Sequence, residues 1–146
     1  MGQQQILLIL VVTVIAGVAT VVAINTMSST LQQNNIDAVR VDLSVIAAQM
    51  QAYYQKPRGM GGGSKSFVGV TFDKIAFQTD SIDATGMIAR NGNAIFNIES
   101  ATNSMVVLTA QPSTGPVMAF DNLSNSEITQ RAEVTLSGVV MRYQVE

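Results

Sequence analysis

Residues 59–66 carry the side chains most suggestive of chemistry, in the order Gly-Met-Gly-Gly-Gly-Ser-Lys-Ser. They nearly match the phosphate-binding loop G-x-x-x-x-G-K-[ST], whose backbone N–H groups and lysine bind phosphate. However, Ser64 stands where the second glycine is required, and the segment follows a predicted helix instead of a strand. These departures argue against nucleotide binding, and they favour a flexible glycine-rich linker over residues 57–66.

Two groups of oxygen-bearing side chains suggest calcium binding as a second possibility. One group contains Asp80 and Asp83, and the other contains Asp121, Asn125 and Glu127. Carboxylate and amide oxygens suit calcium, but neither group has the ligand spacing of a known calcium loop. We therefore expect solvated loop acids and no metal ligands.

Missing residue types exclude most other active-site chemistry. The chain contains no histidine and no cysteine, so it offers no zinc ligands of the usual kind, no thiol nucleophile and no histidine base. The only lysines, Lys56, Lys65 and Lys74, lie in no convincing context for a catalytic base. The net charge of −2 provides no basic patch for nucleic acid. We expect no catalytic residues, no cofactor and no enzyme activity.

The elements around these residues are more informative, beginning with an uncharged apolar stretch over residues 6–24. No charged side chain precedes Asp37, and only Thr13, Gly17 and Thr20 interrupt the stretch. As a helix it spans about 28 Å, close to the hydrocarbon thickness of a bilayer. It suits a signal peptide, a membrane anchor, or a helix that begins in a membrane and ends in an assembly. In an assembly, we expect the core helix to contribute Ile6, Leu7, Leu8, Leu10, Val11, Val14, Ile15, Val18, Val21, Val22 and Ile24.

Helical periodicity returns beyond residue 35 as two apolar stripes. One stripe consists of Ile36, Val39, Leu43, Ile46 and Met50, and the other of Ala38, Val41, Val45 and Ala48, continued by Ala52. Val39 and Val41 are two positions apart, about 200° around a helix, so the stripes lie on opposite faces. Such a helix is either buried within its own domain, or it binds its own head on one side and neighbouring subunits on the other.

The chain thus predicts an α+β fold, with a long N-terminal helix packed on a small antiparallel β-sheet head. Since no proline precedes Pro57, one helix can occupy residues 3–55, within a helical region 1–56. The head should span residues 67–146. Its expected strands are a hairpin of residues 85–90 and 93–98 with a type I′ turn at Asn91-Gly92, then 105–110 and 132–145, with 67–72 either a strand or irregular.

This layout resembles the type IV pilins and pseudopilins. The resemblance rests on a glycine before an uncharged apolar helix, its amphipathic extension, a glycine-rich loop and a small antiparallel head. It implies cleavage after Gly2, so that the mature chain begins at Gln3. The family usually has a glutamate where this chain has Leu7, and we expect the amides of residues 3–5 to form hydrogen bonds between subunits instead.

The resemblance further implies a structural role. The chain would wait in the inner membrane, associate with the pilus assembly machinery, and then join copies of itself in an extracellular filament whose core is the apolar helix. Three alternatives stay open from the sequence: a membrane-anchored protein with a small extracytoplasmic binding head, a minor pseudopilin of a secretion system, and an archaeal-type pilin with a β-sandwich head.

Overall fold

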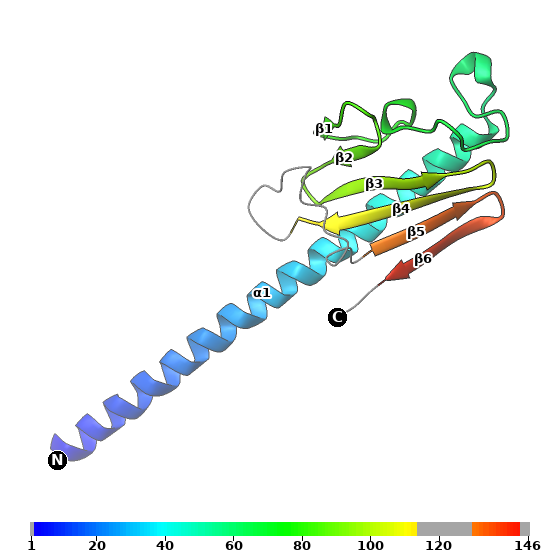
Figure 1. Cartoon of the computed structure of the whole chain (residues 1–146). Helices are drawn as coiled ribbons and strands as arrows, with labels where there is room; N and C mark the ends of the chain where they lie inside the picture. Colours follow the sequence, from blue (N-terminus) through cyan, green and yellow to red (C-terminus); the bar gives the residue numbers. More distant parts are fainter. Residues whose placement is uncertain (1, 114–129, 144–146) are drawn as a thin grey trace. The chain divides into compact units, whose positions relative to one another are not determined.

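The computed structural model describes residues 2–113 and 130–143, which divide into two compact units. The first unit ends at Asn34 and the second begins at Asn35. Within the described residues the chain forms one long helix, α1 (Gly2–Gln55), two short 3-10 helices and six strands (Figure 1). The predicted α+β class is confirmed.

Helix α1 is continuous over 54 residues. It begins one residue before the predicted start and ends where expected, at Gln55, because Pro57 cannot continue a helix. The weak helix formers around residue 28 do not interrupt it. There the hydroxyl groups of Thr26, Ser29 and Thr30 donate to helix carbonyls one turn back, at 2.9 Å in each case, which satisfies them without breaking the helix.

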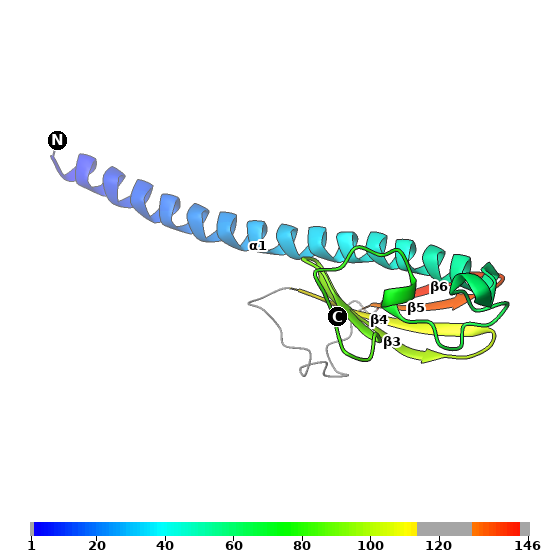
Figure 2. The same ribbon diagram turned by 90° about the horizontal axis from the view of Figure 1, so that it is seen from above.

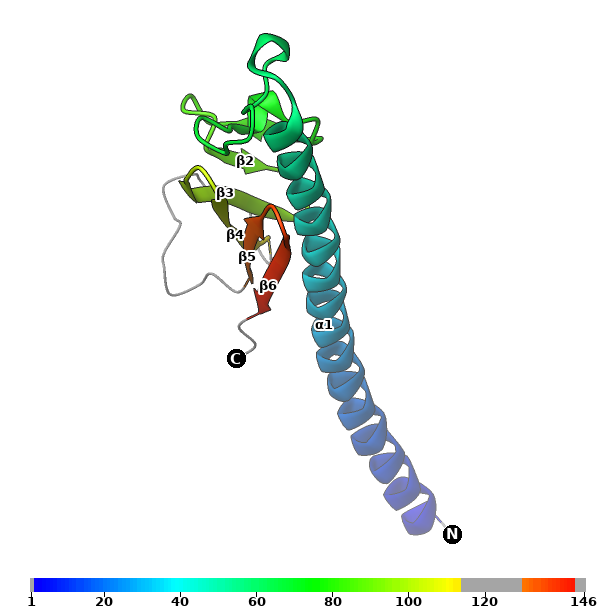
Figure 3. The ribbon, with the colours of Figure 1, turned by 90° about the vertical axis from the view of Figure 1, so that its right-hand side faces the viewer.

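The strands form one antiparallel sheet in which neighbours in sequence are neighbours in space. They are β1 (Ser81–Ile82), β2 (Ile88–Arg90), β3 (Ala94–Ala101), β4 (Met105–Pro112), β5 (Gln130–Thr135) and β6 (Gly138–Tyr143). Such a meander, in which consecutive strands are neighbours, is the simplest topology. The second part of α1 lies across one face of the sheet (Figures 2 and 3).

The β2–β3 hairpin is confirmed, but its predicted type I′ turn is wrong. Neither Asn91 nor Gly92 has a positive φ angle, which a type I′ turn requires. Instead, Oδ1 of Asn91 accepts hydrogen bonds from the backbone N–H groups of Asn93 (2.9 Å) and Ala94 (3.0 Å). An asparagine side chain can thus replace a backbone carbonyl in closing a turn.

The expected single strand over residues 132–145 is also wrong. The chain reverses at Leu136 and Ser137, so β5 and β6 form a hairpin. The alternation of Val134, Leu136 and Val140 spans this turn, and Leu136 is 60% exposed. The Ser137-Gly138 dipeptide is a turn signal, but the apolar alternation that continues across it favours one continuous strand. Residues 144–146, the last part of the predicted strand, lie outside the described residues.

Smaller differences concern the beginning of the head. For residues 67–72 the irregular alternative is confirmed, since they contain a turn at residues 68–69 and enter the 3-10 helix Phe72–Lys74. Strand β1 was not predicted, because two residues carry no periodicity. Strand β4 continues to Pro112, two residues beyond its predicted end at Ala110.

The hydrophobic core lies between the second part of α1 and the facing side of the sheet. Helix residues Val39, Leu43, Ile46 and Met50 are completely buried. They belong to one cluster with alternate residues of the central strands, namely Ala94, Phe96, Ile98, Val106, Leu108, Ala110, Ala132 and Val134. This packing explains why the helix needs only one of its two apolar stripes for the fold of the head.

Candidate assembly surfaces

The apolar stretch over residues 6–24 is exposed along its whole length. Its large side chains are between 45% exposed, at Val11, and 67% exposed, at Ile6 and Leu7. By length and composition alone, α1 is long and apolar enough to cross a membrane, and its apolar part is not buried in the described structure. A continuous apolar surface of this extent marks a membrane-binding or protein-binding site.

The few polar groups inside this stretch are satisfied within the helix. The hydroxyl of Thr13 donates to the carbonyl of Ile9 at 2.9 Å, and that of Thr20 donates to the carbonyl of Ala16 at 2.8 Å. No hydroxyl in this stretch therefore needs water. The stretch can enter a lipid bilayer or a bundle of apolar helices without leaving these donors unpaired.

The predicted processing residues, Gly2 and Gln3, lie in the first turn of α1. A Cβ atom added at Gly2 would meet nothing within 4 Å. Gln3, Gln4 and Gln5 are exposed. Cleavage after Gly2 stays a prediction, as do hydrogen bonds between subunits from the side-chain amides of residues 3–5.

Beyond Asn35, the two predicted stripes of α1 lie in different environments. The stripe of Val39, Leu43, Ile46 and Met50 is buried against the sheet, and Ile36 at its beginning is half-buried. In the opposite stripe, Val41 is 63% and Val45 43% exposed. Ala48 and Ala52 are exposed as well, and Ala38 is half-buried. This second set, from Ala38 to Ala52, is called the outward stripe below.

The glycine-rich segment after α1 caps the helix. The N–H groups of Gly63, Ser64 and Lys65 donate to the carbonyls of Tyr53, Lys56 and Tyr54 at 2.9, 3.0 and 2.8 Å. These are the donors that a phosphate-binding loop would present to its ligand, and here they bind the end of the helix. Gly62 and Gly63 are buried, and a Cβ atom at either position would collide with backbone atoms. Glycine is therefore required at these two positions by close packing. The N–H groups of Gly63, Ser64 and Lys65 are already hydrogen-bonded to the helix and are not free to bind phosphate.

The β2–β3 turn is fixed to α1 by a carboxylate that sequence reasoning missed. Oδ2 of Asp42 accepts a hydrogen bond from the amide of Asn91 at 2.8 Å and another from the amide of Asn93 at 2.9 Å. Hydrogen bonds to a charged group are stronger than those between neutral groups. Sequence alone could not predict this contact, because no regular spacing links one acid on a helix to two asparagines about fifty residues later.

Beside this contact lies a groove of about 460 Å³. It is defined by Asp42, Val45, Ala76, Phe77, Gln78, Asp80, Asn91, Gly92 and Asn93. Among these described residues Asp42 and Asp80 are the only charged ones, so we call it the acidic groove. It adjoins the outward stripe, because Val45 belongs to both.

Candidate calcium ligands do not come together in the described part of the chain. No group of three acidic, histidine or cysteine residues there is placed to hold a metal ion. The carboxylate of Asp83 is hydrogen-bonded within its own turn, because its Oδ2 accepts a hydrogen bond from the hydroxyl of Thr85 at 2.7 Å. This hydrogen bond, helped by the backbone N–H groups of Thr85 and Ala84, lowers the pKa of Asp83 below its ordinary value. The second group, at residues 121–127, lies outside the described residues.

Comparison with known proteins leaves the chain without an assigned family. No family model matches it, and no curated protein or solved structure does so either. The architecture is nevertheless pilin-like in its coarse features, with a long apolar N-terminal helix and an antiparallel sheet in contact with the same helix.

Proposed function

We propose that this chain is the structural subunit of an extracellular helical filament of the type IV pilus kind. Residues 6–24 hold it in the inner membrane until the pilus assembly machinery adds it to the growing filament at the cell surface. There the N-terminal helices of neighbouring copies replace lipid around the apolar stretch. The head folds on the second part of each helix.

The exposed outward stripe is the observation that carries this proposal. A helix that only anchors and supports its own head needs an apolar face toward the sheet and a polar face toward water. Here Val41 and Val45 are exposed on the other face of the helix, accompanied by Ala48 and Ala52. The small alanine side chains let another helix approach closely, and the exposed valines offer it apolar surface, so neighbouring copies of α1 fit this face.

The energetics of the apolar stretch support the same conclusion. Removing one Val, Leu or Ile side chain from water stabilises by about 1.5–3 kcal/mol, and thirteen such side chains between residues 6 and 24 are exposed. Lipid and neighbouring helices both provide this gain. Transfer from membrane to filament therefore costs little for the apolar stretch, while the filament adds burial of the outward stripe.

A membrane-anchored binding protein is the second candidate, and the acidic groove favours it. Its volume of about 460 Å³ lies within the range of small-molecule sites. In that case the outward stripe would stay in water and would tolerate polar substitution. The two candidates therefore differ at Val41 and Ala48.

Electron microscopy of material sheared from cells that express the full chain tests the proposal. We expect regular fibres composed of this chain. In the Val41→Lys, Ala48→Lys variant, fibre yield should fall about tenfold or more, because an unpaired charge buried between helices costs several kcal/mol. The first of these substitutions places a cation one turn after Asp37, so the helix itself gains a favourable pair.

Val140→Lys is the matched control. Val140 is 52% exposed on β6 and lies opposite Glu133 in the register, so the new charge is accommodated on the sheet face away from α1. Its fibre yield should equal that of the unmodified chain. Absence of fibres from the unmodified chain, or fibres unaffected by the helix substitutions, would favour the anchored binding protein.

A further inference from the structure

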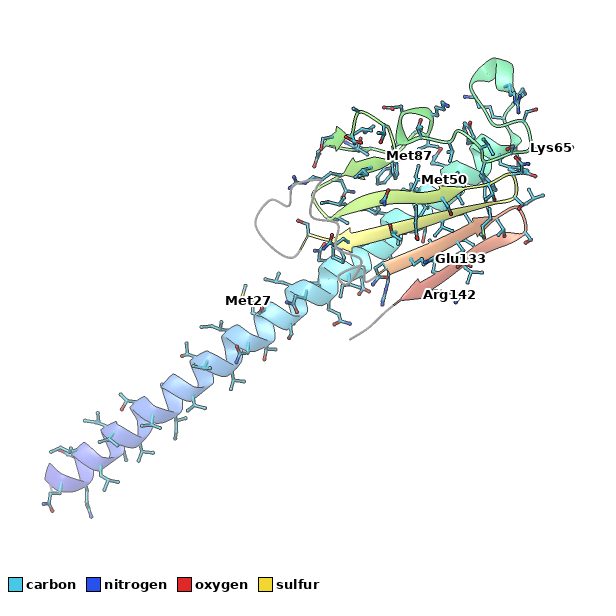
Figure 4. The ribbon with its side chains drawn as sticks, viewed as in Figure 1. Met27, Met50, Lys65, Met87, Glu133 and Arg142 are labelled. Atoms are coloured by element: carbon cyan, nitrogen blue, oxygen red, sulfur yellow. The ribbon has the colours of Figure 1, made fainter. Side chains whose placement is uncertain are left out.

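The loop that follows α1 has a concentration of positive charge. Lys56, Arg58 and Lys65 are all exposed there, and residues 43–72 contain no acidic side chain. Within the described residues, none of the three forms an ion pair within 4 Å. Figure 4 shows Lys65 at the end of the head where this loop leaves the helix. We call these three residues the basic tip.

The acidic groove lies near the other end of the head. Its two charged side chains are those of Asp42, which the β2–β3 turn holds by two amide hydrogen bonds, and Asp80, which is exposed. Two arginines lie in this region but do not line the groove. Arg40 pairs with Asp37 at 3.0 Å, and Arg90 alternates with buried Ala89, which places it on the outer face of the sheet.

The groove and the tip cannot meet within one head. Asp42 and Lys56 are fourteen residues apart along α1, which corresponds to about 21 Å along the helix axis. Between the groove and the tip, acidic and basic side chains lie next to each other. Asp73 precedes Lys74 in the sequence, and Arg131 lies 3.6 Å from Glu99. Among the described residues, the groove is therefore lined by two carboxylates, and the three cations of the basic tip lie at the other end of the second part of α1.

We propose that the acidic groove of one copy binds the basic tip of another copy in the filament. This contact rests on the proposed filament function and names the head surfaces that join its subunits. The two surfaces differ, so the contact is heterologous. Repeated contacts of this kind produce an open helical polymer instead of a closed dimer.

The lining of the groove suits a long cationic side chain. Val45 and Phe77 contribute apolar surface beside the carboxylates, so the methylene groups of Arg58 can pack there while its guanidinium reaches Asp80. Charge complementarity within one sequence identifies a second copy as the occupant. The continuity of the groove with the outward stripe through Val45 places the head contact beside the helix contact.

Two charge-reversed chains test this inference. One carries Arg58→Glu and Lys65→Glu in the tip, and the other carries Asp80→Arg in the groove. These side chains are exposed and outside the core. Expressed alone, each full-length variant should yield about tenfold fewer fibres or less, since like charges then face each other across the interface. Coexpressed, the two variants should recover fibres, because each tip now meets a groove of opposite sign only in the other variant.

Arg142→Glu is the control, since Arg142 is exposed on β6 away from both surfaces (Figure 4). It should assemble like the unmodified chain. Single variants that assemble normally, or coexpressed variants that assemble no better than either alone, overturn the groove-and-tip contact while fibres of the unmodified chain keep the filament function. If the unmodified chain forms no fibres, it is the filament function that fails.

Discussion

Residues 6–24 and residues 36–53 belong to the same helix and are both rich in apolar side chains, yet they are stabilised differently. Within the described residues, the first segment has no buried side chain, whereas six residues of the second are buried. Helices are stabilised mainly by packing of an apolar face. The second segment packs on its own sheet, whereas the first has no such packing among the described residues.

Charge marks the change from one segment to the other. Residues 2–34 contain no charged side chain, and the first acid, Asp37, lies just after the boundary between the two compact units at Asn34 and Asn35. A head with exposed surface in water needs charged residues, while a segment that can enter a lipid bilayer must avoid them. The same helix can therefore serve both environments.

The largest expected effect is in the second segment. Leu43→Ala should lower the free energy of unfolding of the head by about 2–5 kcal/mol, because Leu43 is completely buried and the substitution leaves a cavity. Pulse proteolysis of the full chain in mild detergent across a urea series measures this change.

Val41→Ala is the matched substitution on the opposite face of the helix. Since Val41 is 63% exposed, its head stability should change by less than about 0.5 kcal/mol. Equal losses for the two variants would show that the head buries both faces, which contradicts the comparison.

A charge in the first segment should have the next largest effect, and on a different property. Val14→Asp should disfavour membrane insertion by about 2.5–3.5 kcal/mol, the cost of an aspartate near the centre of a membrane helix. Membrane flotation measures the bound fraction, and Val14→Leu serves as control. Head stability in the urea series should be unchanged, because Val14 contributes nothing to the core cluster. A head destabilised by this substitution would indicate that the two segments are not independent.

The contact between α1 and the β2–β3 turn should have a smaller effect. Asp42→Ala removes a carboxylate that accepts two amide hydrogen bonds, each worth about 1.5–3 kcal/mol at most when the acceptor is charged. Because Asp42 is half-buried, we expect a total loss near the lower value. The same urea series measures it.

Asp37→Ala is the appropriate comparison for Asp42. Asp37 pairs with Arg40 on its own helix and its side chain is 61% exposed, so the loss should be below about 0.5 kcal/mol. Similar results for both acids would mean that the asparagine contacts do not stabilise the head.

The sequence could predict features that depend on local periodicity. The long helix, its two stripes and the β2–β3 hairpin follow from side-chain spacing and from the first proline. Periodicity could not place the turn at Leu136 and Ser137, because the alternation of Val134, Leu136 and Val140 continues across the Ser137-Gly138 turn signal. Nor could it relate Asp42 to Asn91 and Asn93, because no pattern joins residues that far apart.

The glycine-rich segment shows a different limit. Its composition suggests flexibility, but Gly62 and Gly63 are buried where the loop caps the helix. Glycine serves a flexible chain and a close backbone approach equally well. Only the packing distinguishes the two uses.

The smallest expected effect concerns pH, which should change the stability of the head but not the membrane binding of the first segment. Residues 2–34 have no ionisable side chain, so binding of the apolar stretch to neutral lipid vesicles should not change between about pH 6 and pH 2.

The head, in contrast, carries Asp83, whose pKa is lowered by the hydrogen bond from the Thr85 hydroxyl and by backbone N–H groups. A carboxyl group with a lowered pKa in the folded state stabilises above its ordinary pKa of 3.8, and it loses this contribution as the pH falls through the lower folded value. Thr85→Val removes the hydroxyl, so the variant should be slightly less stable than the unmodified chain at pH 6, and the difference should shrink toward pH 2. A difference that is constant over this range would mean that the hydroxyl stabilises the turn without favouring the charged carboxylate.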